Sequence, residues 1–215
     1  PGRRLGNYHL VKLLAQGGSG YIYQARHQHL RTLVAVKVLH TQLDGDGLRR
    51  FREEARIAAQ FDHANIVRVL DFGVEKGTPF LVMDYAPHGT LRERYLDGVA
   101  YSPSTILKHI QQVSNALQYI HELGFIHRDV KPDNMLLGKG YQSLLGDFGI
   151  SMATLPDNVL TTASRTGTVA YMAPEQIVGK ACPASDQYAL GVVTYEWLSG
   201  TRLFHGTTLN IARQH

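Results

Sequence analysis

The periodicity of apolar residues changes near residue 86, and this change limits the folds that the chain can adopt. Before it, short runs rich in valine, leucine, isoleucine and tyrosine are separated by turn residues, a pattern typical of β-strands. After it, apolar residues recur at helical spacing. The sequence therefore predicts an α+β fold with two lobes: a small antiparallel β-sheet lobe with one helix over residues 1–86, and a mainly helical lobe over residues 87–215.

Five strands and one helix are expected in the first lobe. The runs "YHLVKLLAQ" and "YIYQARH" flank the glycine cluster "GGSG", which indicates a hairpin, and the further strand-like runs are "TLVAVKVLH", "NIVRVLDFGV" and "PFLVMDYA". Between the third and fourth runs, "DGLRRFREEARIAAQFD" has the composition of a helix that places Phe51, Ala55 and Ala58 on one face.

Two helices are predicted to organise the second lobe. The first begins with Ser102 as its N-cap and Pro103 in its first turn, and it ends at Gly124. Its buried face is expected to consist of Ile106, Ile110, Val113, Leu117 and Ile120. The second, "ASDQYALGVVTYEWLS", is apolar on nearly every side and should form the buried centre of the lobe. We expect a ligand to bind in the cleft at the joint "APHG".

Composition argues against several classes of protein. The single cysteine, Cys182, cannot pair within the chain, which fits a reducing compartment, and we expect a cytoplasmic protein. The chain shows no secretory signal and no apolar run long enough to span a bilayer. Its 22 basic and 18 acidic residues are dispersed, which is typical of a solvated surface and not of a nucleic-acid site. The 11 histidines lack the spacing of a zinc site.

Three stretches carry residues suited to phosphate chemistry. Alone, "QGGSGYIY" is a weak signal, because glycine clusters between strands are most often tight turns; it is not a Walker A loop. Lys37 in "VAVKVL" could be a solvent-facing lysine, but a glutamate on the one helix of the same lobe is a natural partner for it. In "FIHRDVKPDNMLL", Asn134 follows Asp129 by five positions, and Asp147 follows in "LLGDFGIS". Converging carboxylate and amide oxygens suit a hard cation such as Mg2+.

In this order, the motifs resemble those of the eukaryotic-like Ser/Thr protein kinases of the type often found in bacteria. The resemblance runs from Leu13 to about His215 and implies a two-lobed protein kinase-like fold. It also implies that the chain uses ATP and Mg2+, with Mn2+ as an alternative metal, and that it phosphorylates serine or threonine in proteins.

The resemblance assigns roles to individual residues. The catalytic residues are Asp129 as base, Lys131 as γ-phosphate stabiliser, and Lys37, which holds the α- and β-phosphates and pairs with Glu54; the metal ligands are Asn134 and Asp147. The nucleotide site comprises the glycine-rich lid (Gly17, Gly18, Gly20), Ile22 and Ala35 at the adenine, Met83 as gatekeeper, the hinge (Asp84, Tyr85, Ala86) and Leu136 as pocket floor. An internal spine of Ala58, Leu70, His127 and Phe148 is also implied.

The resemblance bears on acceptor and regulation. Lys131 and the threonine in "GTVAYMAPE" match the Ser/Thr pattern and not the tyrosine kinase pattern. Arg128 could grip a phosphate on a nearby loop residue, and trans-autophosphorylation through self-association would supply that phosphate. The candidate acceptors are Ser151, Thr154, Thr161, Thr162, Ser164, Thr166 and Thr168, of which Thr162 best matches the usual activating position.

The chain departs from the family pattern at three places. Ala15 replaces the first lid glycine, which predicts a stiffer lid. Ala58 is small where a larger apolar residue is usual, which would leave the Lys37–Glu54 pair easier to break. The family pattern continues after residue 215 with several helices and with the arginine that usually pairs with Glu175, so Glu175 is expected to be unsatisfied or rearranged. We expect a fragment of a longer protein that carries a membrane span or sensor domain elsewhere.

Two alternatives to an active protein kinase remain at this point. The first is a nucleotide-binding pseudokinase or scaffold, although decayed enzymes usually lose at least one of Lys37, Asp129, Asn134 and Asp147, which are all present. The second is a kinase-like small-molecule phosphotransferase, against which the threonine-rich loop before "APE" argues.

Overall fold

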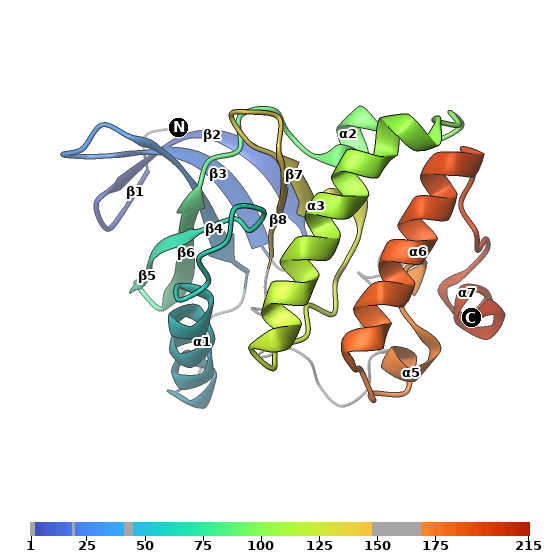
Figure 1. Ribbon diagram of the computed structural model, residues 1–215. Helices are drawn as coiled ribbons and strands as arrows, with labels where there is room; N and C mark the ends of the chain where they lie inside the picture. Colours follow the sequence, from blue (N-terminus) through green and yellow to red (C-terminus); the bar gives the residue numbers. More distant parts are fainter. Residues whose placement is uncertain (1–2, 19, 41–44, 148–168) are drawn as a thin grey trace. The chain divides into compact units, whose positions relative to one another are not determined.

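The computed structural model of the chain describes residues 3–18, 20–40, 45–147 and 169–215. These residues form two compact units (Figure 1). The N-terminal unit holds the described residues up to 62 together with 67–86, and the C-terminal unit holds residues 63–66 and the described residues from 87 onward. None of the described helices is both long and apolar enough to cross a membrane.

An antiparallel sheet forms the N-terminal unit, and its strand order is β1-β2-β3-β4-β6-β5. The strands are β1 (Arg4–Leu5), β2 (Tyr8–Gly17), β3 (Gly20–His27), β4 (Leu33–Leu39), β5 (Val69–Glu75) and β6 (Thr78–Asp84). Helix α1 (Gly45–Ala58) follows β4 and buries Phe51, Ala55 and Ala58, as predicted. The predicted sheet with one helix is thus confirmed, while the short strand β1 was not predicted.

The alternation of side chains along β4 gives this sheet two different faces. Val34, Val36 and Val38 belong to a buried apolar cluster with residues of β1, β2, β3 and β6. Ala35 and Lys37 alternate with these valines and therefore point to the opposite face. One face thus holds the core of the unit, and the other carries the lysine that the sequence singled out.

The buried residue at the start of strand β5 differs from the predicted one. The Leu70 side chain is 43% exposed, whereas that of Val69 is only 7% exposed, so the prediction that Leu70 belongs to an internal spine is wrong. Because successive side chains of a strand point to opposite faces, an error of one position exchanges a buried residue for an exposed one. Val69 lies opposite the buried Met83 in β6 and is the inward residue.

The β2–β3 hairpin requires a glycine at one of its two paired ends. Gly17 pairs with Gly20 across the turn. A Cβ atom placed on Gly20 would lie 2.1 Å from the Val38 carbonyl oxygen of β4, whereas one on Gly17 would have nothing within 4 Å. Close backbone approach therefore requires glycine at position 20 and not at position 17.

The C-terminal unit is mainly helical, as predicted. Its elements are α2 (Leu91–Arg94), α3 (Pro103–Glu122), η1 (Pro132–Asn134), β7 (Met135–Leu137), β8 (Ser143–Leu145), α5 (Pro174–Ile177), α6 (Pro183–Ser199) and α7 (Thr208–Gln214). Helix α3 packs against α6 and against β8, which pairs with β7 in a two-stranded hairpin (Figure 1).

Helix α3 begins and ends where the sequence predicts, but its buried face differs at one position. It starts after Ser102, with Pro103 in its first turn, and Gly124 follows it with φ of 81°. Ile110 is only half-buried, while the preceding His109 is 8% exposed. His109 turns inward because its Nδ1 lies 2.7 Å from the Ser143 hydroxyl oxygen of β8.

Helix α6 is buried on more than one side, as expected, and it ends at Gly200, whose φ of 73° is left-handed. Two acids are buried in this otherwise apolar helix: Asp186 is 1% exposed and Glu196 is 5% exposed. A buried carboxylate is costly unless it is paired or hydrogen-bonded, so both must have partners in the unit.

Glu175, at the start of α5, is satisfied within the chain. Its Oε1 accepts a hydrogen bond of 2.5 Å from the Ser185 hydroxyl of α6. This bond holds the pKa of the Glu175 carboxyl below its usual value. The expectation of an unsatisfied glutamate is therefore wrong, and the rearranged alternative is the one observed.

The hairpin geometry predicts that replacing glycine by alanine changes the free energy of unfolding more at position 20 than at position 17. Gly20→Ala should lower the free energy of unfolding by about 1–3 kcal/mol, because the added Cβ overlaps the Val38 carbonyl. Gly17→Ala, with open space at its Cβ, should change it by less than about 1 kcal/mol. Urea unfolding of both variants measures the difference, and equal losses would contradict the close approach at Gly20.

A second prediction concerns the stability of the chain in acid. Burial, together with the charges of Arg94 and Lys108, lowers the pKa of His109 from 6.5. Below pH 6.5 the unfolded chain binds a proton at His109 that the folded chain does not bind. The free energy of unfolding therefore decreases as the pH is lowered, by at most about 1.4 kcal/mol per pH unit. His109→Asn, which can keep the bond to Ser143, should show a shallower loss in urea unfolding. Parallel curves for the two proteins would rule out this role.

Candidate active site

The loop that carries Asp129 is held by a buried carboxylate on α6. Asp186 Oδ2 accepts a 2.8 Å hydrogen bond from the backbone N–H of His127, and its Oδ1 accepts one of 2.8 Å from that of Arg128. His121 Nε2 of α3 lies 2.8 Å from Oδ2 as well. One side chain thus joins the centre of the unit to the two residues that precede Asp129.

This anchoring holds a strained backbone. Arg128 has φ of 67°, a left-handed conformation that arginine rarely adopts. Its N–H is fixed by Asp186, and its carbonyl accepts a 2.6 Å hydrogen bond from Gln176 Nε2 of α5. Such strain persists only where the surroundings over-determine it, and it sets the direction in which the next residue leaves the loop.

His127 connects the loop to the strand that leads to Asp147. Its Nδ1 accepts a 3.2 Å hydrogen bond from the Asp129 N–H and so carries no proton, while its Nε2–H donates to the Gly146 carbonyl at 2.9 Å. Gly146 in turn donates its N–H to the Asn134 carbonyl at 2.9 Å. The backbone at Asp129, at Asn134 and next to Asp147 is therefore linked through the His127 ring and one backbone hydrogen bond.

The side chains of Asp129, Lys131 and Asn134 converge. Lys131 Nζ lies 2.9 Å from both carboxylate oxygens of Asp129, and Asn134 Nδ2 donates to Asp129 Oδ2 at 2.8 Å and to its carbonyl at 2.7 Å. Asn134 is 7% exposed, so this arrangement lies at the inner end of the loop. A base and a cation are thus held at one place.

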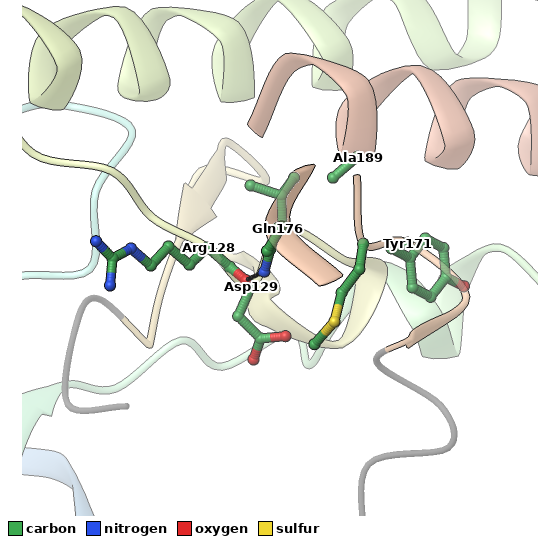
Figure 2. A pocket seen from close by; sticks show the side chains of 7 residues that line it. Arg128, Asp129, Tyr171, Gln176 and Ala189 are labelled. Atoms are coloured by element: carbon green, nitrogen blue, oxygen red, sulfur yellow. Dashed lines mark hydrogen bonds between the residues drawn. The ribbon is translucent and has the colours of Figure 1, made fainter. Parts of the chain in front are cut away.

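A shallow depression lies beside Asp129. It is lined by Arg128, Asp129, Val130, Tyr171, Met172, Gln176 and Ala189. Figure 2 shows the Asp129 carboxylate between Arg128 and the segment that carries Tyr171, together with the bond from Gln176 to the Arg128 carbonyl. Tyr171 and Met172, in the segment 169–173, thus form one wall next to the candidate base.

Two residues at this site have the chemistry of ligands for a hard cation. Asn134 turns its amide nitrogen to Asp129, which directs its oxygen elsewhere, and Asp147 follows directly on the β8 connection, with φ of 62°. Within the described residues there is no group of three or more His, Cys, Asp or Glu that could hold a metal. Two oxygen ligands fit a metal such as Mg2+, which takes few protein ligands and completes its shell with phosphates and water.

In the N-terminal unit, four predicted nucleotide-site residues share one face of the sheet. The register places Ile22 opposite Lys37 and Ala35 opposite Met83, and directly opposed residues point to the same side. Since Ala35 and Lys37 are two apart in β4, all four side chains lie on this face. Lys37 is 5% exposed, so it is not the solvent-facing lysine of the alternative interpretation.

Helix α1, which carries Glu54, covers the same face. Phe51 of α1 contacts Phe72 of β5, with ring centroids 6.2 Å apart, and Phe72 lies opposite Leu81, which lies opposite Lys37. Glu54 follows Phe51 by three positions and is half-buried. Helix α1 thus packs on the sheet face that carries Lys37, and the Lys37–Glu54 pair stays a prediction.

The remaining predicted residues lie as follows. Gly17, Gly18 and Gly20 form the β2–β3 hairpin end, Asp84 ends β6 with Tyr85 and Ala86 after it, and Leu136 is the central residue of β7. Phe148 and the candidate phosphorylation sites Ser151, Thr154, Thr161, Thr162, Ser164, Thr166 and Thr168 lie outside the described residues.

Three residues that position the loop were not predicted: His121, Gln176 and Asp186. Asp186 had a detectable signal, because an acid inside the apolar run "SDQYALGVV" must have a buried partner. His121 and Gln176 had none, because neither lies in an unusual sequence context.

Comparison with known proteins gives a consistent result. Residues 8–215 match the protein kinase domain family. The chain is 40% identical to the serine/threonine-protein kinase PknA of Mycobacterium tuberculosis, over 98% of this chain and 51% of that protein. It is 35% identical to the serine/threonine-protein kinase PrkC of Bacillus subtilis, over 100% of this chain and 34% of that protein. The chain therefore spans about half the length, or less, of these relatives.

A solved structure agrees in fold. The crystal structure of the Mycobacterium tuberculosis PknI kinase domain, in a mutant with one cysteine replaced by alanine, superposes with a TM-score of 0.76 at 28% identity, covering 95% of this chain and 78% of that one. Membership of the family implies the use of ATP and a divalent metal ion in general. From the match over residues 8–215 and from these likenesses, the chain belongs to the protein kinase domain family, with bacterial serine/threonine-protein kinases among its relatives.

Proposed function

We propose that this chain is the catalytic domain of a serine/threonine protein kinase, which transfers the γ-phosphoryl group of ATP to serine or threonine hydroxyls of proteins. The observation that carries the proposal is the convergence of Lys131 and Asn134 on the Asp129 carboxylate, in a loop anchored by Asp186. The names of the bacterial relatives support the serine/threonine class.

The lobes of the proposed domain are residues 1–86 and 87–215, with Lys37 and Glu54 contributed by the first. The lysine on its sheet face would hold the α- and β-phosphates, while Ile22, Ala35 and Met83 on the same face would contact adenine. A buried lysine keeps its charge most readily beside a carboxylate, which is the role proposed for Glu54.

The proposed reaction needs little covalent chemistry from the protein. The acceptor oxygen bonds to the γ-phosphorus as the bond to the bridging oxygen breaks, ADP leaves, and the acceptor proton passes to Asp129. Lys131, which lies 2.9 Å from the Asp129 carboxylate oxygens, would neutralise charge on the transferred group. Asn134 and Asp147 would hold Mg2+, or Mn2+ in its place, and the bound metal would neutralise phosphate charge.

Regulation by phosphorylation is part of the proposal. Arg128 has a buried Nε that lacks a hydrogen-bond partner among the described residues. A guanidinium in this state would gain charge-assisted hydrogen bonds from a phosphate on the segment between "DFG" and "APE". The proposed route is trans-autophosphorylation between two copies of a cytoplasmic kinase domain.

The first test is the transfer of labelled γ-phosphate from ATP to a generic basic protein, with Mg2+ or Mn2+. Asp129→Asn should lower the rate by about 10²–10⁴, because it removes the proton acceptor and keeps the shape. Asp46→Asn, at an exposed ion pair of α1, is the matched control and should leave the rate unchanged. Near wild-type activity of Asp129→Asn would contradict the assignment. An inactive wild-type protein that still binds ATP would favour the pseudokinase alternative.

The second test concerns Arg128. Mass spectrometry of the active protein after incubation with ATP should find phosphate between Thr161 and Thr166, and Arg128→Ala should reduce the activation that this phosphate brings. Full activity with an unmodified segment would contradict this part of the proposal and leave the transfer reaction itself intact.

A further inference from the structure

One guanidinium in the C-terminal unit has contacts to four separate segments. Arg92 of α2 forms a 2.6 Å ion pair through Nη1 with Glu196 Oε1 of α6, and its Nη2 donates to the Tyr171 hydroxyl. Its Nε lies 3.5 Å from Asp133 Oδ2 of η1, and Nη1 lies 2.9 Å from Asp97 Oδ1. A planar fork with five N–H donors can make these contacts at once, which a lysine ammonium cannot.

Tyr171 closes the cluster. It accepts from Arg92 and donates to Glu196 Oε2 at 2.6 Å, so Arg92, Tyr171 and Glu196 form a ring of three hydrogen bonds. Burial, reinforced by the bond to Glu196, raises the pKa of the Tyr171 phenol, which keeps it protonated as a donor. Burial opposes the charge of Arg92, but the bond to Glu196, together with the charges of Tyr171, Glu196 and Asp133, outweighs burial and raises the pKa of Arg92.

The cluster touches the candidate site on two sides. Tyr171 lines the depression beside Asp129, where it forms one wall together with Met172. Asp133 lies in η1, between Lys131 and Asn134, whose side chains contact Asp129. Arg92 therefore links the segment that carries Tyr171 to the turn that carries Asp133, and it ties both to α6 through a carboxylate that is 5% exposed.

We propose that Arg92 is a positioning residue for phosphoryl transfer: it fixes residues 169–173, beside which the acceptor hydroxyl must lie, relative to the turn that holds Lys131 and Asn134. This inference rests on the proposed kinase function. Misplacement of reacting groups by about 1 Å can cost on the order of 100-fold in rate, so a small shift between these two segments has a large effect. The adenine contacts proposed for Ile22, Ala35 and Met83 and the α- and β-phosphate contact proposed for Lys37 belong to the N-terminal unit and do not depend on Arg92.

The test compares Arg92→Ala and Arg92→Lys with Arg202→Ala in the full-length protein. Arg202 is the matched control, because it pairs with Asp97 at 3.6 Å and, among the described residues, makes no ion pair with Glu196 or Asp133. Arg92→Ala should lower kcat/KM for a protein acceptor by about 10- to 100-fold and leave the KM for ATP within about twofold. The kcat/KM of Arg92→Lys should lie nearer to that of Arg92→Ala than to that of the wild type, and the kcat/KM of Arg202→Ala should equal that of the wild type.

Hydrogen exchange provides a readout that needs no activity. The Asn134 N–H donates to the Lys131 carbonyl and the Met172 N–H to the Val169 carbonyl, so both report on the two linked segments. Arg92→Ala should speed exchange at both amides, whereas Tyr171→Phe, which keeps the fold and loses one hydroxyl, should speed it at Met172 alone. Unchanged exchange at both amides in Arg92→Ala would overturn the proposal, even if activity fell.

The two proposals can fail separately. An inactive wild-type protein would remove the proposed function, while exchange at Asn134 and Met172 would still test whether Arg92 joins the segments. An active wild-type protein in which Arg92→Ala raises the KM for ATP as much as the KM for the acceptor would show that Arg92 supports the binding of both substrates, and would contradict its positioning role. Added guanidinium ion should partly restore acceptor phosphorylation in Arg92→Ala, and should not affect Arg202→Ala.

Discussion

The buried carboxylate of Asp186 is the interaction on which the rest of the candidate site depends. It accepts the N–H groups of His127 and Arg128, which would otherwise be unpaired in a partly buried loop. This bonding holds Arg128 in its left-handed conformation and so directs Asp129 toward Lys131 and Asn134. The helix that carries Asp186 is the packed centre of the unit. The hydrogen bonds of Asp186 therefore attach the loop to the most buried helix of the unit.

The two units contribute different kinds of chemistry, each built on its own regular structure. In the N-terminal unit, strand alternation separates a core face from a face with Lys37 and its apolar neighbours. In the C-terminal unit, polar side chains project from a loop and a hairpin connection that α3 and α6 support. The proposed phosphate binding thus lies on strands. The proposed proton transfer lies in a loop that is held in place by its hydrogen bonds to Asp186 of α6.

Much of this arrangement could be predicted from the sequence, because local patterns determine strands, helices and the order of motifs. The hairpin, α1, α3 and α6 follow from periodicity and capping residues, and the candidate site residues follow from short motifs. Two predictions of buried residues were wrong by one position: Leu70 was expected to be buried where Val69 is, and Ile110 where His109 is. Contacts such as Arg92–Glu196, which join residues 104 positions apart, depend on tertiary packing that no local pattern encodes.

Native-state hydrogen exchange at the His127 and Arg128 amides of the wild-type protein and of Asp186→Asn tests the central claim most directly. If Asp186 anchors the loop, both amides should exchange in the wild type as slowly as the core of α6, and substantially faster in the variant, whose amide offers a single acceptor oxygen. Exchange in the wild type as fast as in exposed turns, or no change on substitution, would show that the loop is held by something other than this carboxylate.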